Sequence, residues 1–156
     1  MYKNSMDEQD NSTVGKILCL KPGRDWTDDG VHRIMTPLKE KYRLGYDIAD
    51  CVYKAKICFG SNQYMGVLFT SFGTGAYDGT NSWLPRPEYG ICHVTRMAKE
   101  RGLPIIVLND IPSRTLFEWL DTCVKREGGV EAIIPGLDKE ALDRAVQQYF
   151  MSRVRV

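Results

Sequence analysis

Residues 103–110 read LPIIVLND and residues 131–142 read EAIIPGLDKEAL. Each segment contains an apolar run of the length of a buried strand, and the second continues into a helical pattern. Apolar strands that alternate with helices are typical of parallel sheets covered on both faces, and such domains usually carry their reactive side chains just after the strands. The residues at those places here are Asn109, Asp110, Pro135 and Gly136. The two segments therefore predict a fold more clearly than a reaction.

Three further apolar runs precede these segments, so the chain as a whole predicts five strands. We expect strands at 14–20, 46–52, 65–72, 103–108 and 130–134. Helical patterns alternate with them, at 27–42, 53–59, 88–101, 113–127 and 138–150. Pro37 should kink or interrupt the first helix. The alternation predicts an α/β fold, a doubly wound, flavodoxin-like sheet of five parallel strands with helices on both faces and a functional edge at the strand carboxyl ends.

Length and composition place the chain among single-domain globular proteins. We expect a disordered leader at 1–13, one domain at 14–151 and a frayed tail at 152–156. A net charge of +1 gives no overall field to attract nucleic acid or an anionic membrane. Five cysteines without a CxxC pair, after an N-terminus that does not resemble a signal peptide, favour reduced thiols in the cytoplasm. Neither histidine has a ligand-spaced partner, so we predict no metal and no cofactor.

Four segments resemble the strands of response-regulator receiver domains in order and spacing. They are 44–47 (LGYD), 64–69 (YMGVLF), 103–108 (LPIIVL) and 129–132 (GVEA), the last followed by 137–142 (LDKEAL) at the start of the final helix. The resemblance covers most of residues 16–150. It implies the five-stranded fold, and it also implies a homodimer through the last strand–helix edge, residues 133–149, where receivers commonly pair.

The residues that perform chemistry in receiver domains are missing from the matching positions. The acidic pair after the first strand is replaced by Lys21 and Pro22, and the phosphoacceptor aspartate by Thr70. The hydroxyl residue after the fourth strand is replaced by Asn109, and the lysine after the fifth by Pro135. Aspartyl phosphorylation needs a carboxylate nucleophile and a divalent cation on oxygen ligands. We therefore interpret the chain as a pseudo-receiver, a signalling module that works without phosphorylation and without catalysis.

The segment 73–90 is longer than the usual βα connection of about 2–6 residues. It contains residue types that dominate protein–protein binding sites: Tyr77, Trp83, Arg86 and Tyr89. One interpretation is a recognition surface for another protein. The other is a lid folded over the sheet edge, with Trp83 covering the core, and the sequence leaves both open.

A second resemblance gives the same segment an enzymatic interpretation. Asp78-Gly-Thr80, then Glu88 before a helix, is similar to nucleoside 2-deoxyribosyltransferases and to TIR-type NAD-cleaving domains. That similarity implies an N-glycosidase or transferase in which Glu88 attacks the anomeric carbon and Asp78 holds the ribose. Glu88 has a simpler role as an acidic residue at the positive end of its helix, which we favour.

Overall fold

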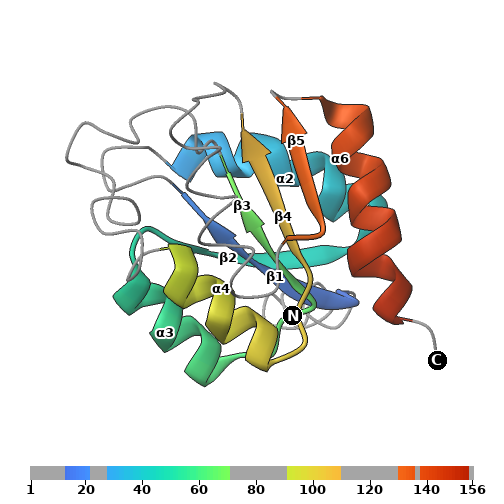
Figure 1. Cartoon of the computed structure of the whole chain (residues 1–156). Coiled ribbons are helices and arrows are strands. Elements are labelled where there is room, and N and C mark those ends of the chain that lie inside the picture. The colour runs from blue at the N-terminus through green and yellow to red at the C-terminus, as the bar shows by residue number, and fades with distance from the viewer. Residues whose placement is uncertain (1–12, 22–27, 71–90, 110–129, 136–137, 155–156) are drawn as a thin grey trace, which may run out of the picture.

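The computed structural model describes residues 13–21, 28–70, 91–109, 130–135 and 138–154. Within them, a five-stranded sheet has the order β2-β1-β3-β4-β5, with every neighbouring pair parallel (Figure 1). The strands are β1 (Gly15–Leu20), β2 (Leu44–Ala49), β3 (Gly66–Phe69), β4 (Ile105–Asn109) and β5 (Ala132–Pro135). The helices are α2 (Asp28–Tyr42), α3 (Val52–Ser61), α4 (Ile91–Glu100) and α6 (Lys139–Ala145). The predicted α/β fold is confirmed.

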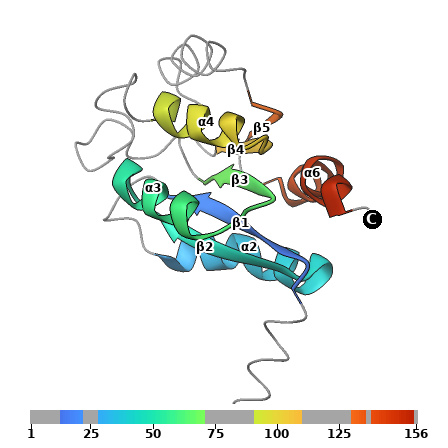
Figure 2. The ribbon, with the colours of Figure 1, turned by 90° about the horizontal axis from the view of Figure 1, so that it is seen from below.

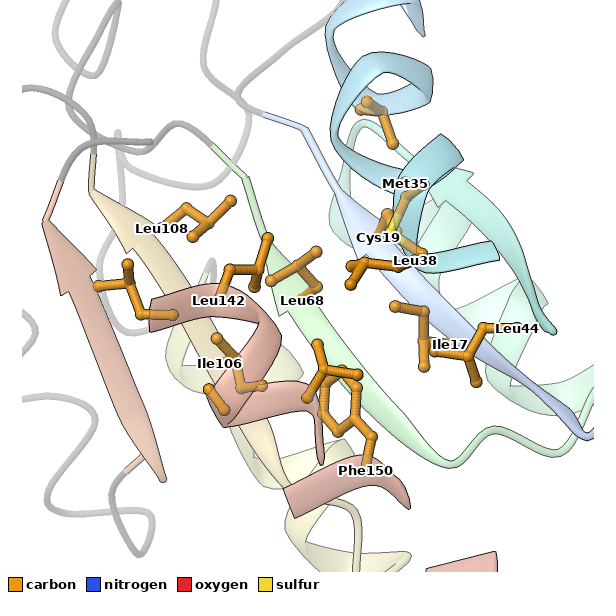
Figure 3. Close-up of a cluster of buried hydrophobic side chains, with 14 residues drawn as sticks. Ile17, Cys19, Met35, Leu38, Leu44, Leu68, Ile106, Leu108, Leu142 and Phe150 are labelled. Carbon is orange, nitrogen blue, oxygen red and sulfur yellow. The ribbon is translucent and has the colours of Figure 1, made fainter. Parts of the chain in front are cut away.

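The sheet carries one apolar core on each face, because alternate residues of each strand point to opposite sides. Leu18 and Leu20 of β1 pack with α3 and α4, whereas Ile17 and Cys19 pack with α2 and α6. Figure 2 shows the helices on the two sides, and Figure 3 shows the core under α2 and α6. Both faces of β1 and β3 are therefore covered, which explains why their sequences are apolar throughout.

The second strand begins earlier than its sequence pattern predicts. It covers Leu44–Ala49 instead of 46–52, because its register with β1 opposes Leu44 to Gly15. Arg43, with φ of 57°, makes the turn that separates β2 from α2. Residues 50–52 turn the chain and begin α3.

The predicted interruption at Pro37 is wrong, because α2 runs unbroken from Asp28 to Tyr42 with Pro37 inside it. Pro37 itself is exposed, so its ring meets solvent and not the sheet. Val31 and Met35 on one side of Pro37 and Leu38 on the other are buried against the sheet. This packing holds the residues before and after Pro37 against the sheet and outweighs the local cost of the proline.

The final helix begins where the sequence predicts and then changes pitch. Asp138 caps α6, and its Oδ1 accepts a hydrogen bond of 3.0 Å from the backbone N–H of Ala141. The chain continues as a π-helix, η2 (Val146–Phe150), and a 3-10 helix, η3 (Met151–Val154). The 3-10 helix overlaps the start of the expected frayed tail. The expected leader and the helix at 113–127 lie outside the described residues. Among the described helices, none is both long and apolar enough to cross a bilayer.

Candidate functional site

The carboxyl edge of the sheet brings together the positions that the receiver resemblance singles out. Lys21 follows β1 and Thr70 follows β3, and these strands are paired so that Leu20 opposes Phe69. Asn109 and Pro135 end β4 and β5 and oppose each other directly. The arrowheads of β4 and β5 in Figure 1 mark this edge. The sheet thus places four of the five predicted positions on one edge, and Pro22 lies outside the described residues.

Lys21 is buried at this edge and pairs with the first turn of α2. Its Nζ donates a hydrogen bond of 2.7 Å to Oδ1 of Asp28, and its backbone N–H donates to the carbonyl of Ala49 at 3.0 Å. The hydrogen bond from Lys21 holds the pKa of the Asp28 carboxyl below its usual value. An ammonium group therefore occupies the place where receivers have two carboxylates. The side chain that follows β1 is thus a cation, and the Asp28 carboxylate balances its charge.

Thr70 is fully buried and its hydroxyl is already bonded. Thr70 Oγ1 donates to the carbonyl oxygen of Leu20 at 3.0 Å, and the Thr70 backbone N–H donates to the same oxygen at 2.9 Å. Both bonds tie the end of β3 to the end of β1. The side chain at the phosphoacceptor position thus serves as a link between strands, and it presents no carboxylate nucleophile.

A divalent cation does not fit the described residues of this edge. Magnesium needs hard oxygen ligands, several of them carboxylates or waters. At the ends of β1 and β3, the described side chains are an ammonium and a bonded hydroxyl, and the described part of the chain holds no group of three His, Cys, Asp or Glu side chains suited to a metal. The Asp28 carboxylate already forms an ion pair with Lys21.

Asp28 belongs to this edge although it is not among the positions predicted from the sequence. It lies with Asp29 in the first turn of α2, where acidic residues are common because they interact favourably with the helix N-terminus. The signal that could have identified the pair is the distance of seven residues between Lys21 and Asp28, across one strand-to-helix connection. The end of a strand and the start of the helix that follows it lie at the same edge of the sheet, so a lysine and an aspartate at these two places can meet.

The predicted surface and enzyme residues all lie outside the described residues, so their predictions stand as made. They are Tyr77, Trp83, Arg86 and Tyr89 for protein binding, and Asp78 and Glu88 for glycosidic chemistry. For Asn109 and Pro135 the structure gives the backbone position and register.

Comparison with solved structures identifies the fold. The receiver domain of a sensor histidine kinase from Pseudomonas aeruginosa, with a magnesium ion in its active-site cleft, superposes with a TM-score of 0.60 at 15% identity, over 88% of this chain and 98% of that one. The receiver domain of a Francisella response regulator gives 0.54 at 12% identity, over 89% and 98%. No family model and no curated protein matches the sequence. The chain has the fold of receiver domains.

Proposed function

We propose that the chain is a phosphorylation-independent, receiver-like signalling module that acts through contacts with other proteins. The observation that carries this proposal is the buried Lys21 ammonium and its ion pair with Asp28. The Lys21 ammonium supplies positive charge at the end of β1 and engages the Asp28 carboxylate that could otherwise bind a divalent cation. Thr70, bonded to Leu20, also offers no carboxylate that a phosphoryl group could modify at the end of β3.

A module without a phosphoryl switch changes state only when a partner prefers one of its conformations. A ligand shifts such an equilibrium by no more than the difference between its affinities for the two states. The partner is therefore another protein, and binding itself is the signal. The last strand–helix edge, residues 133–149, is the surface through which the chain would form a homodimer. Free thiols at Cys19, Cys51 and Cys58 suit a reducing compartment, and we assign the module to the cytoplasm.

The proposal is tested by an NMR titration with Mg²⁺ and beryllofluoride, and separately with acetyl phosphate. We expect no saturable change at the amides of Lys21, Thr70 or Asn109. A receiver domain that has its aspartate serves as the positive control under the same conditions. Saturable shifts at Thr70 that need both Mg²⁺ and the phosphoryl analogue would overturn the proposal.

A variant tests whether Lys21 is the reason that the protein does not bind Mg²⁺ at this edge. Lys21→Ala removes the fixed cation and frees Asp28, so weak Mg²⁺-dependent shifts should appear near Asp28 in this variant and be absent from the wild type. Identical behaviour of the two proteins in the Mg²⁺ titration would show that Lys21 does not take the place of a cation.

A further inference from the structure

Helix α3 exposes the largest apolar side chains of the described residues. Tyr53 is 73% exposed and Ile57 is 50% exposed, and they lie one helical turn apart on the same face. The opposite face of α3 is anchored in the core by Ala55 and Phe59. Tyr53 and Ile57 thus form an apolar stripe on the exposed side of α3. The helix itself lies on one face of the sheet (Figure 2).

Gly60 extends this stripe, and nothing within the described structure accounts for a glycine there. It lies seven residues after Tyr53, so it falls on the same face of the helix. A Cβ at Gly60 would meet nothing within 4 Å, and Gly60 has no positive φ that an alanine would resist. Glycine weakens a helix relative to alanine. One use of glycine is to let another backbone approach closely, and the open space at Gly60 leaves room for such an approach from outside.

Both charged side chains that flank the stripe on α3 are cationic. After the larger effect of Lys21, the nearby Lys54 ammonium also contributes to the lowered pKa of the Asp28 carboxyl. Lys54 and Lys56 are exposed on its two sides, and α3 contains no acidic residue. Neither lysine forms an ion pair with another described residue. An apolar stripe flanked by two lysines on each copy cannot pair with itself without placing lysine beside lysine, so the charge pattern favours an acidic partner over a second copy.

A hollow of about 390 Å³ lies at the end of α3, on the Phe59 side of the helix. Phe59 and Tyr64 line it on one side, and Arg101 lines it at the end of α4. The Arg101 guanidinium lies 4.9 Å from the centroid of the Phe59 ring and donates to the Met97 carbonyl at 3.0 Å. No carboxylate among the described residues pairs with this guanidinium. The hollow therefore offers a positioned cation to an incoming acidic side chain.

We propose that the outer face of α3, made of Tyr53, Ile57 and Gly60 between Lys54 and Lys56, docks an acidic amphipathic helix of a partner protein. The apolar side of that helix covers Tyr53 and Ile57, and its backbone comes closest at Gly60. Glutamates or aspartates on its flanks pair with the two lysines, and one at its end enters the hollow beside Arg101. This surface is distinct from the carboxyl edge of the sheet, so the proposal does not depend on the role of Lys21.

The test uses a peptide of about 20 residues, long enough to be helical in isolation, with leucines along one face and glutamates on both flanks. A second peptide carries lysines in place of the glutamates. Titration of each into isotope-labelled protein, up to about 1 mM peptide, detects affinities down to the millimolar range by NMR. We expect the glutamate peptide to shift the amides of Val52–Ser61 and Arg101, and the lysine peptide to leave them unchanged.

Three variants assign the binding to the proposed features. Lys54→Glu with Lys56→Glu should lower the affinity for the glutamate peptide by about tenfold or more, as expected for two reversed charge contacts. The matched reversal Arg33→Glu with Lys39→Glu, on the exposed side of α2, should change its affinity less than about twofold, near the typical effect of a distant surface change. Gly60→Leu should abolish the shifts while leaving the rest of the spectrum intact, because its side chain has open space in the free protein.

Four outcomes would overturn the proposal. They are the absence of shifts on α3, equal binding of both peptides, equal loss in the α2 reversal, and retention of binding in Gly60→Leu. Two further outcomes would also overturn the proposed acidic helix as the partner. A dimer in sedimentation that Tyr53→Ser with Ile57→Ser dissociates would identify a second copy of the chain as the partner. Binding through α3 to phosphatidylserine vesicles, but not to the glutamate peptide, would identify a lipid surface. The Mg²⁺ and beryllofluoride titration depends on none of these results, so the two proposals can fail separately.

Discussion

Phe150 lies directly against Gly66, so that a Cβ built on Gly66 would overlap the Phe150 ring. Phe150 is fully buried and ends the π-helix η2, and Gly66 begins β3 in the centre of the sheet. The wider turn of a π-helix adds one residue to the helical path and changes which side chains face the sheet. Here it accompanies the placement of an aromatic ring on the one position of β3 that has no side chain.

Gly66→Ala should therefore destabilise the protein by about 1–3 kcal/mol, the usual cost of overpacking a filled core. Neither the strand nor the buried ring can move aside easily. Urea unfolding measures the loss. Gly60→Ala is the matched control, because its new methyl group meets nothing within 4 Å, and it should instead stabilise the protein by about 0.5–1 kcal/mol. Equal effects of the two substitutions would contradict the packing of Phe150 on Gly66.

The Asp138 cap gives a second prediction, on local helix stability. Its side chain accepts the hydrogen bond of the Ala141 N–H while remaining exposed, so Asp138→Ala removes the cap without disturbing the core. We expect a loss of about 1 kcal/mol in the free energy of unfolding. Asp138→Asn keeps the acceptor and should retain most of that stability. A loss in the asparagine variant as large as in the alanine variant would assign the effect to charge and not to the cap.

The fold could be predicted because buried parallel strands and their helices leave strong local patterns. The runs around Leu18, Leu68 and Ile106 are apolar on both faces of the sheet, and residue types at helix starts such as Asp138 have a local preference. β2 begins two residues and ends three residues earlier than predicted, because it is an edge strand of mostly half-buried residues whose register depends on Gly15 of a different strand.

The remaining features depend on contacts between distant residues. The π-helix that ends at Phe150 accompanies the contact of this ring with Gly66 on another element. The uninterrupted course of α2 through Pro37 depends on packing against the sheet. In the candidate site, the sequence identified Lys21 and Thr70 as replacements for reactive residues. It did not show that Lys21 pairs with Asp28, because that contact exists only once β1 and α2 are placed side by side.

Pro37 gives a third prediction, which follows from the uninterrupted helix. A proline in a helix interior costs about 3 kcal/mol relative to alanine, since it removes the N–H that would bond the Arg33 carbonyl. Part of this cost is offset, because proline also restricts the unfolded chain by about 0.4–1 kcal/mol. Pro37→Ala should therefore raise the free energy of unfolding by about 1–2 kcal/mol. Lys39→Ala, at an exposed site in the same helix, serves as a control. A loss of stability in Pro37→Ala would mean that the proline stabilises the folded helix instead of opposing it.

The Lys21–Asp28 pair predicts how stability depends on pH. The hydrogen bond from Lys21 lowers the pKa of Asp28 below its ordinary 3.8, so the folded protein releases this proton more readily than the unfolded chain. The resulting stability is present above pH 3.8 and is lost as the pH falls through the lowered pKa. Asp28 has a side chain 54% exposed, so solvent screening keeps the effect below about 1 kcal/mol.

The hydrogen bond from Lys41 also lowers the pKa of the Asp143 carboxyl. The dependence of wild-type stability on pH therefore contains both carboxyls and does not by itself isolate Asp28. The comparison that does so is with Lys21→Met, which keeps the length of the buried side chain and removes its charge. We expect the difference in unfolding free energy between the two proteins to be constant from neutral pH down to about pH 5, above the titration range of an ordinary aspartate. Below that it should shift steadily in favour of the variant, because only the wild type loses an ion pair. A difference that stays constant through the acid range would show that Asp28 titrates in the folded protein as it does in the unfolded chain, and that the Lys21 ammonium is not bound to it in solution.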